Sequence, residues 1–174
     1  MLQKRYRKYK FINFGCSGYG TIHQFLQIED LLKSNKKPKL AIFTYMAFHD
    51  ERNVLSRSRK KNLKEMNSLG EELYYPSAEL NPEDILEINI SDINYEGIPF
   101  INFSSIMNAI DDIYNSYDLK NQNLKVVSQK LISNILDLTS TNKIKTIFVG
   151  VYNDKETKDM LGFISNNYDV KVID

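Results

Sequence analysis

Apolar residues gather in short runs that carry few charges and are bounded by glycine or polar residues. Runs of this length, rich in β-branched and aromatic residues, are typical of buried strands in a parallel sheet. The pattern predicts strands at Lys10–Phe14, Leu40–Tyr45 and Thr146–Val151, and a fourth that begins near Tyr168.

The segments between these runs have apolar residues at helical spacing. In the clearest of them, LKVVSQKLISNILDL, Leu124, Val127, Leu131, Ile135 and Leu138 share one face. Thr21 is predicted to cap a helix that continues through IHQFLQIEDLLK, and Ser104 to cap one that ends near Tyr117. The remaining predicted helices are a charged one from Phe48 to Met66 and the segment KETKDMLGFISNN.

The segment from Leu69 to Phe103 differs from the rest because it contains three prolines, two glycines and alternating pieces such as ILEINI. We interpret it as an irregular excursion with short strands inside a single domain, 1–174. Strands that alternate with helices predict an α/β fold, with three layers (α/β/α), a mainly parallel sheet and helices on both faces.

Composition narrows the classes of function without choosing one. The chain has 174 residues with 42% hydrophobic and 26% charged residues, and a net charge of +1 gives no reason to expect nucleic acid or a membrane as partner. We interpret the basic cluster Arg57, Arg59, Lys60, Lys61 as the solvated face of a helix. Cys16, the single cysteine, excludes an intrachain disulfide, and we predict it to be buried. We expect a cytoplasmic chain as given, without a cofactor or metal.

Three glycines occupy one turn between a predicted strand and a predicted helix, in the stretch FINFGCSGYGTIHQF. A turn of this kind brings backbone N–H groups close to a negative group. The spacing of Gly15, Gly18 and Gly20 departs from the dinucleotide-binding fingerprint, the following strand ends TYM without an acidic residue, and there is no P-loop lysine. These departures argue against nucleotide binding.

The same turn, INFGCSGYGT, resembles the second conserved block of SGNH/GDSL hydrolases, an Asn-x-Gly-x-x-Gly-Tyr-Gly-Thr run after a strand. The segment KPKLAIFTYMAFHDERN resembles the third block, which in some members carries a His-x-x-Arg-Asn pattern, as here from His49 to Asn53. The helix and strand that follow are similar in order, so the resemblance covers most of the chain and implies a flavodoxin-like sheet.

The resemblance implies ester chemistry, with a serine nucleophile, a histidine base and an oxyanion hole. On this mapping the Gly18 N–H is one oxyanion donor, and either Asn53 or His49 supplies the donor from the third block. Donors held where negative charge develops lower a barrier by about 3–4 kcal/mol each.

The two catalytic blocks of the family have no counterpart in this sequence. A Gly-Asp-Ser is absent, and the only histidines, His23 and His49, do not lie in an Asp-x-x-His. Ser17 is a weak candidate for the nucleophile, since a turn serine more often bonds local backbone. For His23 we favour a helix-surface position; for His49 a helix-start role and a site role stay open.

We therefore expect an SGNH-type ester hydrolase or acyltransferase domain, incomplete at both ends and inactive as this chain. By analogy its substrate is a small-molecule or carbohydrate ester. The alternative is a non-catalytic α/β module that binds a partner or a small anion. The family's absent first strand would leave Ile12, Phe14, Ile42 and Phe43 poorly covered. That predicts self-association, or pairing with a missing segment.

Overall fold

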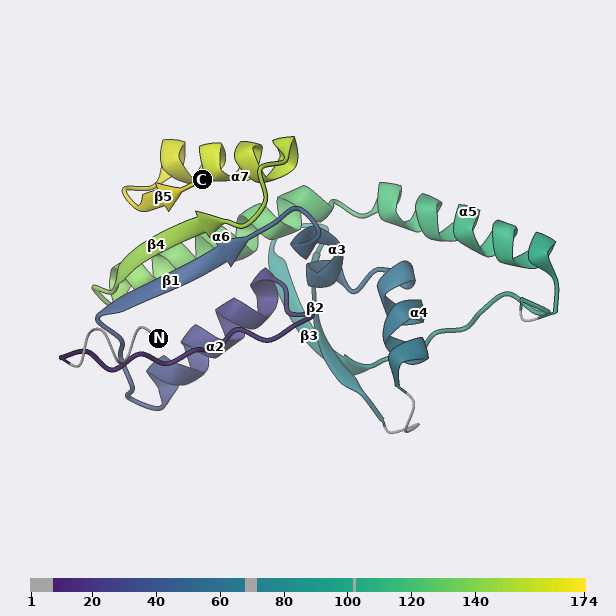
Figure 1. Ribbon diagram of the computed structural model, residues 1–174, viewed down its shortest axis with the longest axis horizontal. Helices are drawn as coiled ribbons and strands as arrows, with labels where there is room; N and C mark the ends of the chain where they lie inside the picture. The colour runs from purple at the N-terminus through teal and green to yellow at the C-terminus, as the bar shows by residue number, and fades with distance from the viewer. Residues whose placement is uncertain (1–7, 68–71, 102) are drawn as a thin grey trace.

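The computed structural model describes residues 8–67, 72–101 and 103–174. Its main sheet has three parallel strands, in the order β1-β4-β5, shown in Figure 1. The strands are β1 (Leu40–Tyr45), β4 (Lys145–Gly150) and β5 (Lys171–Ile173). The prediction that β1 and β4 are parallel neighbours is confirmed, with Phe43 opposite Phe148.

Helices precede or connect these strands, as the periodicity predicts. Their buried positions recur at helical spacing, so that α6 buries Val127, Leu131 and Ile135 on one face. The helices are α2 (Thr21–Lys33), α3 (His49–Val54), α4 (Arg57–Met66), α5 (Ser105–Asn121), α6 (Leu124–Thr141) and α7 (Lys155–Asn167).

The hydrophobic core lies on one face of the sheet. Phe43, Phe148 and Val172 are aligned across the three strands and pack with apolar residues of α2, α6 and α7. The opposite face has no buried residue in the described strands, and Ile42 and Ile173 are exposed on it. The α/β class with a mainly parallel sheet is confirmed, whereas the described residues do not confirm the predicted three-layer, flavodoxin-like arrangement.

The predicted first strand, Lys10–Phe14, is wrong. Within the described residues this segment is not part of a strand, and Ile12 is 57% exposed. Gln27 Nε2 donates to the Phe14 carbonyl, but a side-chain bond does not make a strand. An apolar run can predict a strand, but it does not show whether another strand lies beside it. Of the residues predicted to be poorly covered, Ile12, Phe14 and Ile42 are exposed, but Phe43 is buried in the core.

The free edge of β1 is partly occupied by a side chain. Gln24 in α2 accepts from the Thr44 N–H and donates to the Thr44 carbonyl, at 3.1 and 2.8 Å. The amide thus pairs with the strand backbone as a neighbouring strand would.

Three helix boundaries differ from the sequence prediction. The expected helix from Phe48 to Met66 is two helices, because Leu55 takes a left-handed conformation (φ 51°) and Ser56 Oγ accepts from the Arg59 N–H to cap a new helix. Gly20, not Thr21, is the N-cap of α2. Ser104 does cap α5, but that helix continues to Asn121.

The excursion contains an antiparallel hairpin of β2 (Tyr74–Leu80) and β3 (Leu86–Asp92). Ala78 on β2 packs on Ile22 and Leu131, so the hairpin covers the end of α2 and α6 near the glycine turn. The predicted start of the excursion, at 69, lies outside the described residues. Within the described chain, every helix is too short or too polar to cross a membrane.

Candidate functional site

The glycine turn and α3 meet beyond the carboxyl end of β1, where parallel sheets commonly bind ligands. Asn53 in α3 joins them, since its Oδ1 accepts from the Ile22 N–H at 2.9 Å. Arg52 Nη1 donates to the Tyr19 carbonyl, also at 2.9 Å. The glycine turn with the start of α2 and the segment His49–Asn53 therefore form one hydrogen-bonded unit.

Asn53 is completely buried, and both ends of its amide are used inside the protein. Besides the bond to Ile22, its Nδ2 donates to Ser128 Oγ in α6, at 2.8 Å. In this arrangement Asn53 ties three helices together, and its amide N–H groups do not point to an open substrate position.

Gly20 is required where α2 approaches α3. A Cβ at this position would lie 2.7 Å from Asn53 Oδ1, a distance that real Cβ atoms essentially never show, and 3.0 Å from Arg52 Cβ. The Gly20 N–H is itself bonded to His23 Nδ1. Gly20 therefore allows close packing of the two helices.

Gly18 adopts a left-handed conformation, with φ 89°, as the turn requires. Its carbonyl accepts from the Tyr75 hydroxyl at 2.9 Å and from Arg59 Nη2 at 3.2 Å. Within the described residues no hydrogen bond uses the Gly18 N–H, so this group can donate to a ligand.

Substitution of Gly18 by valine is expected to lower the free energy of unfolding by about 1–3 kcal/mol. Valine avoids positive φ, and the new Cβ would lie 3.2 Å from Arg59 Nη2. Urea denaturation measures the loss. Gly15→Val, in the same turn but without a positive φ, is the control and should cost less. An unchanged midpoint in Gly18→Val would show that the turn accepts a side chain.

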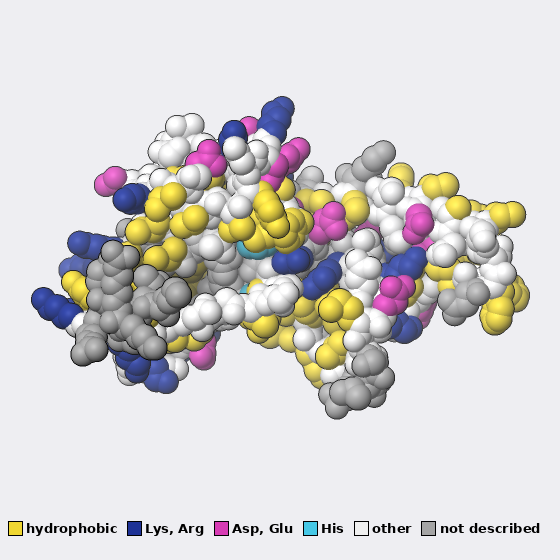
Figure 2. Space-filling view, in the orientation of Figure 1, with side chains coloured by type: hydrophobic (Ala, Val, Ile, Leu, Met, Phe, Trp, Pro, Cys, Tyr) yellow, Lys and Arg dark blue, Asp and Glu magenta, His cyan; other side chains and the backbone are white. Residues whose placement is uncertain are grey.

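Both histidines are buried beside this turn, so the surface position predicted for His23 is wrong. His23 is 8% exposed and stacks on Tyr19, with ring centroids 4.2 Å apart. His49, the first residue of α3, is 4% exposed, and its Nδ1 lies 3.4 Å from Thr21 Oγ1. The only two histidines of the chain appear beside Lys or Arg side chains at the centre of the molecule in Figure 2.

The same environment keeps both imidazoles neutral. Burial, together with the nearby charges of Arg59 and Arg52, lowers the pKa of His23 to about 4. Burial and the charge of Arg52 lower the pKa of His49 to about 4 as well. The Gly20 N–H donates to Nδ1 of His23, which fits a neutral ring. At neutral pH these rings carry no charge.

A nucleophile and base are not assembled around Ser17. Ser17 is exposed, and no hydrogen bond of its hydroxyl is seen within the described residues. Asp50 bonds to the Tyr45 hydroxyl at 2.8 Å, so its carboxyl is committed to β1 instead of to His49. Burial raises the pKa of the Asp50 carboxyl. Cys16, predicted to be buried, is an exposed free thiol.

Two arginines are part of the site although the sequence analysis did not select them. Arg52 lies over the Phe48 ring and Arg59 over the Tyr75 ring, and each also donates to a carbonyl of the glycine turn. Neither has a carboxylate partner within the described residues, and the buried Nε of Arg59 has no hydrogen-bond partner there. Burial and the charge of Arg59 lower the pKa of Arg52. Both arginines lie 30 residues or more from the glycine turn along the chain, so no local sequence pattern linked them to it.

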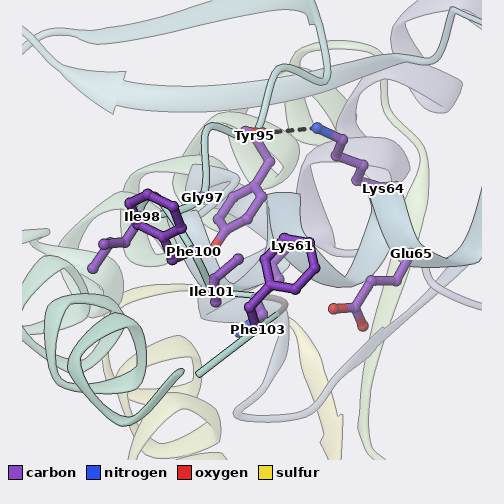
Figure 3. A pocket seen from close by; sticks show the side chains of 9 residues that line it. All are labelled: Lys61, Lys64, Glu65, Tyr95, Gly97, Ile98, Phe100, Ile101 and Phe103. Carbon is purple, nitrogen blue, oxygen red and sulfur yellow. Dashed lines mark hydrogen bonds between the residues drawn. The ribbon is translucent and has the colours of Figure 1, made fainter. Parts of the chain in front are cut away.

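A hollow lies between α4 and residues 95–101 and 103 (Figure 3). Its two lysines are already engaged, because Lys64 donates to the Tyr95 carbonyl and Lys61 to Asp111. The rest of its lining is mostly apolar, with Phe100 and Phe103 exposed. Among the described residues no group of His, Cys, Asp and Glu side chains could hold a metal ion.

No family model, curated protein or solved structure matches the chain at a significant level.

Proposed function

We propose that this chain carries the substrate-binding and oxyanion-stabilising part of an SGNH-type ester hydrolase or acyltransferase. The observation that carries the proposal is the direct bonding of the glycine turn to α3, through Asn53 and Arg52. The Gly18 N–H is the proposed oxyanion donor, because it makes no hydrogen bond to another described residue and is held in a fixed turn. Asn53 supports the turn instead of donating to substrate, and His49 packs against Thr21.

The exposed side of the sheet supports the same proposal. The edge of β1 away from β4 has no strand beside it within the described residues, and one sheet face is uncovered there. A further strand on this edge, which would have to replace the Gln24 amide at Thr44, would bring a catalytic group to the carboxyl end of β1, next to Gly18. The proposal therefore places the serine nucleophile and the Asp–His pair on other segments, which an extended or partner chain would supply. By analogy the substrate is an acylated carbohydrate.

The 174-residue chain is expected to hydrolyse a chromogenic acetyl ester no faster than its Ser17→Ala variant. The Ser17 hydroxyl has no base in hydrogen-bond reach among the described residues, and an unactivated serine is a poor nucleophile. Initial rates with p-nitrophenyl acetate, corrected for the buffer reaction, measure this. A rate that disappears in Ser17→Ala would make Ser17 the nucleophile.

The ester-hydrolase proposal itself is tested in a chain extended by its flanking coding sequence. We expect turnover to appear in the extended chain. Extended chains that fold and bind the ester but do not hydrolyse it would contradict the proposal.

The second candidate function is binding of a small anion without catalysis. It is favoured by the two arginines beside the glycine turn, which lack a carboxylate partner in the described structure, and by the orphan Nε of Arg59. Guanidinium groups suit carboxylate and phosphate oxygens, and they remain charged at neutral pH.

If this second function holds, Arg52→Met and Arg59→Met should each weaken the binding of inorganic phosphate or acetate by about tenfold, because each removes a charge-assisted hydrogen bond. Isothermal titration calorimetry measures the affinities. Lys60→Met, from the same helix as Arg59, is the control and should leave the affinity unchanged. Equal losses in all three variants would indicate a general charge effect.

A further inference from the structure

The glycine turn continues into a row of aromatic residues at the carboxyl end of the main sheet. Arg52 Nη1 donates to the Tyr19 carbonyl at 2.9 Å, and the guanidinium carbon of Arg52 lies 4.5 Å from the centroid of the Phe48 ring. The Tyr152 ring, which follows β4 in the chain, lies 5.9 Å from the Phe48 ring. We call Tyr19, Phe48 and Tyr152 the aromatic row.

The aromatic row is open to solvent. Tyr19, Phe48 and Tyr152 are 36%, 41% and 55% exposed. Figure 2 shows hydrophobic side chains beside Lys or Arg side chains at the centre of the molecule, where Figure 1 places the carboxyl ends of β1 and β4. A single exposed ring needs no explanation, but this row lies where parallel sheets bind ligands and is joined to a basic group.

Two arginines beside the aromatic row keep donors for a ligand. Arg52 bonds to the described protein through Nη1 and Arg59 through Nη2, while the buried Nε of Arg59 has no partner there. Arg59 belongs to the cluster predicted to be a solvated helix face, yet it lies against the Gly18 carbonyl. A guanidinium group has five N–H donors in one plane, so Arg52 and Arg59, the arginine site, can bond to the oxygens of an anion.

Carboxylates at the same end of the sheet limit the charge that this anion can carry. Asp50 and Glu51 belong to α3, and Asp154 and Glu156 lie at the start of α7. Lys155, between the last two in sequence, offsets one of these charges. A ligand with two negative charges, such as phosphate at neutral pH, would therefore be repelled more than a monocarboxylate.

We propose that the arginine site takes a small aromatic carboxylate. Its carboxylate bonds to Arg52 and Arg59, and its ring packs against Phe48 and Tyr152. This inference rests on the second candidate function, the binding of a small anion. Because the Arg52 guanidinium lies over the Phe48 ring, an anion bonded to Arg52 has that ring next to its own body. Aromatic rings pack favourably edge to face or offset, and an uncharged ring is not repelled by the carboxylates of α7.

Calorimetric titration of the 174-residue chain with matched ligands tests the inference. Benzoate should bind about fivefold more tightly than acetate, because only benzoate has a ring to contact the aromatic row. Benzamide has nearly the same shape as benzoate without the charge, and it should not bind measurably. In amide NMR spectra of the isotopically labelled chain, benzoate should shift the signals of Gly18 and Tyr19. Tyr152→Ala should remove the advantage of benzoate over acetate, whatever it does to the affinity for acetate.

Phe103→Ala is the matched control, because the Phe103 ring is 89% exposed and lines the separate hollow shown in Figure 3. This variant should keep the advantage of benzoate. An advantage lost in Phe103→Ala but kept in Tyr152→Ala would place the aromatic anion in that hollow and overturn the proposal. Acetate that binds as tightly as benzoate would contradict the aromatic ligand alone. If neither carboxylate binds, the anion-binding function fails as well.

Discussion

Asp111→Asn is expected to release α5 from α4, with a loss of about 3–5 kcal/mol in the free energy of opening α5. Asp111 is fully buried and is the common partner of Arg57 and Lys61, so neutralising it leaves two positive charges facing a neutral amide. Burial alone would raise the pKa of Asp111, but hydrogen bonds from Arg57, Tyr95 and Lys61 hold this pKa far below its usual range. The carboxylate is therefore charged at neutral pH.

The loss should be local, because α5 packs chiefly on α4 while α6 and β4 have their own core. Hydrogen exchange measured by mass spectrometry should show amides of α5 exchanging at least about 100-fold faster, the rate equivalent of about 3 kcal/mol. Exchange in α6 and β4 should change little.

Asp112→Asn is the matched control for this experiment. Asp112 neighbours Asp111 in sequence, but its carboxylate is 71% exposed and lies 3.6 Å from Lys61. Exposed pairs of this kind contribute about 0–1 kcal/mol. Equal exchange rates in the two variants would mean that the buried network does not hold α5.

The second large effect is a loss of stability in mild acid. His23 and His49 have a pKa of about 4 in the folded chain and an ordinary value of 6.5 when unfolded. Between these values the unfolded chain binds more protons than the folded chain, so stability falls as pH decreases through the window from about 6.5 to 4. Each histidine contributes about 3 kcal/mol to this loss. Since folded chains are stable by only about 5–15 kcal/mol, the protein should unfold in this window or just below it.

Urea denaturation at several pH values from 7 to 4.5 measures the acid effect. His23→Gln and His49→Gln should each remove about half of the pH dependence, whatever they do to the stability at pH 7. Asp50 acts in the opposite sense, because its pKa is raised in the folded state and its protonation on acidification favours folding. Comparing the histidine variants with the unsubstituted chain separates the contribution of the histidines from that of Asp50. A stability that is constant from pH 7 to 5 would show that the histidines are accessible to solvent.

The sequence pattern predicted most elements of the fold because their signals are local. Apolar residues at helical spacing marked α6, and α7 was predicted with the bounds that the structure shows. The runs at β1 and β4 predicted parallel neighbours correctly. The break between α3 and α4 was missed, because a left-handed leucine at 55 has no sequence signature.

The candidate site was only partly predictable. The glycine spacing indicated a tight turn, and Gly18 has the positive φ that such a turn needs. The sequence could not show that Asn53 is committed to Ile22 and Ser128, because a side chain's partners 31 and 75 residues away depend on packing. The role of Arg59 was missed for the same reason.

By itself the sequence determined the α/β class, most of the strands and helices from α2 onward, and the glycine turn before α2, because backbone propensity and hydrophobic spacing act over a few residues. The tertiary structure alone decided three other features: the exposure of Lys10–Phe14, the burial of both histidines, and the orientation of α5 with its apolar side outward. Each depends on which surfaces meet. In α5, the buried charge of Asp111 between Arg57 and Lys61 outweighs the tendency of isoleucine to turn inward.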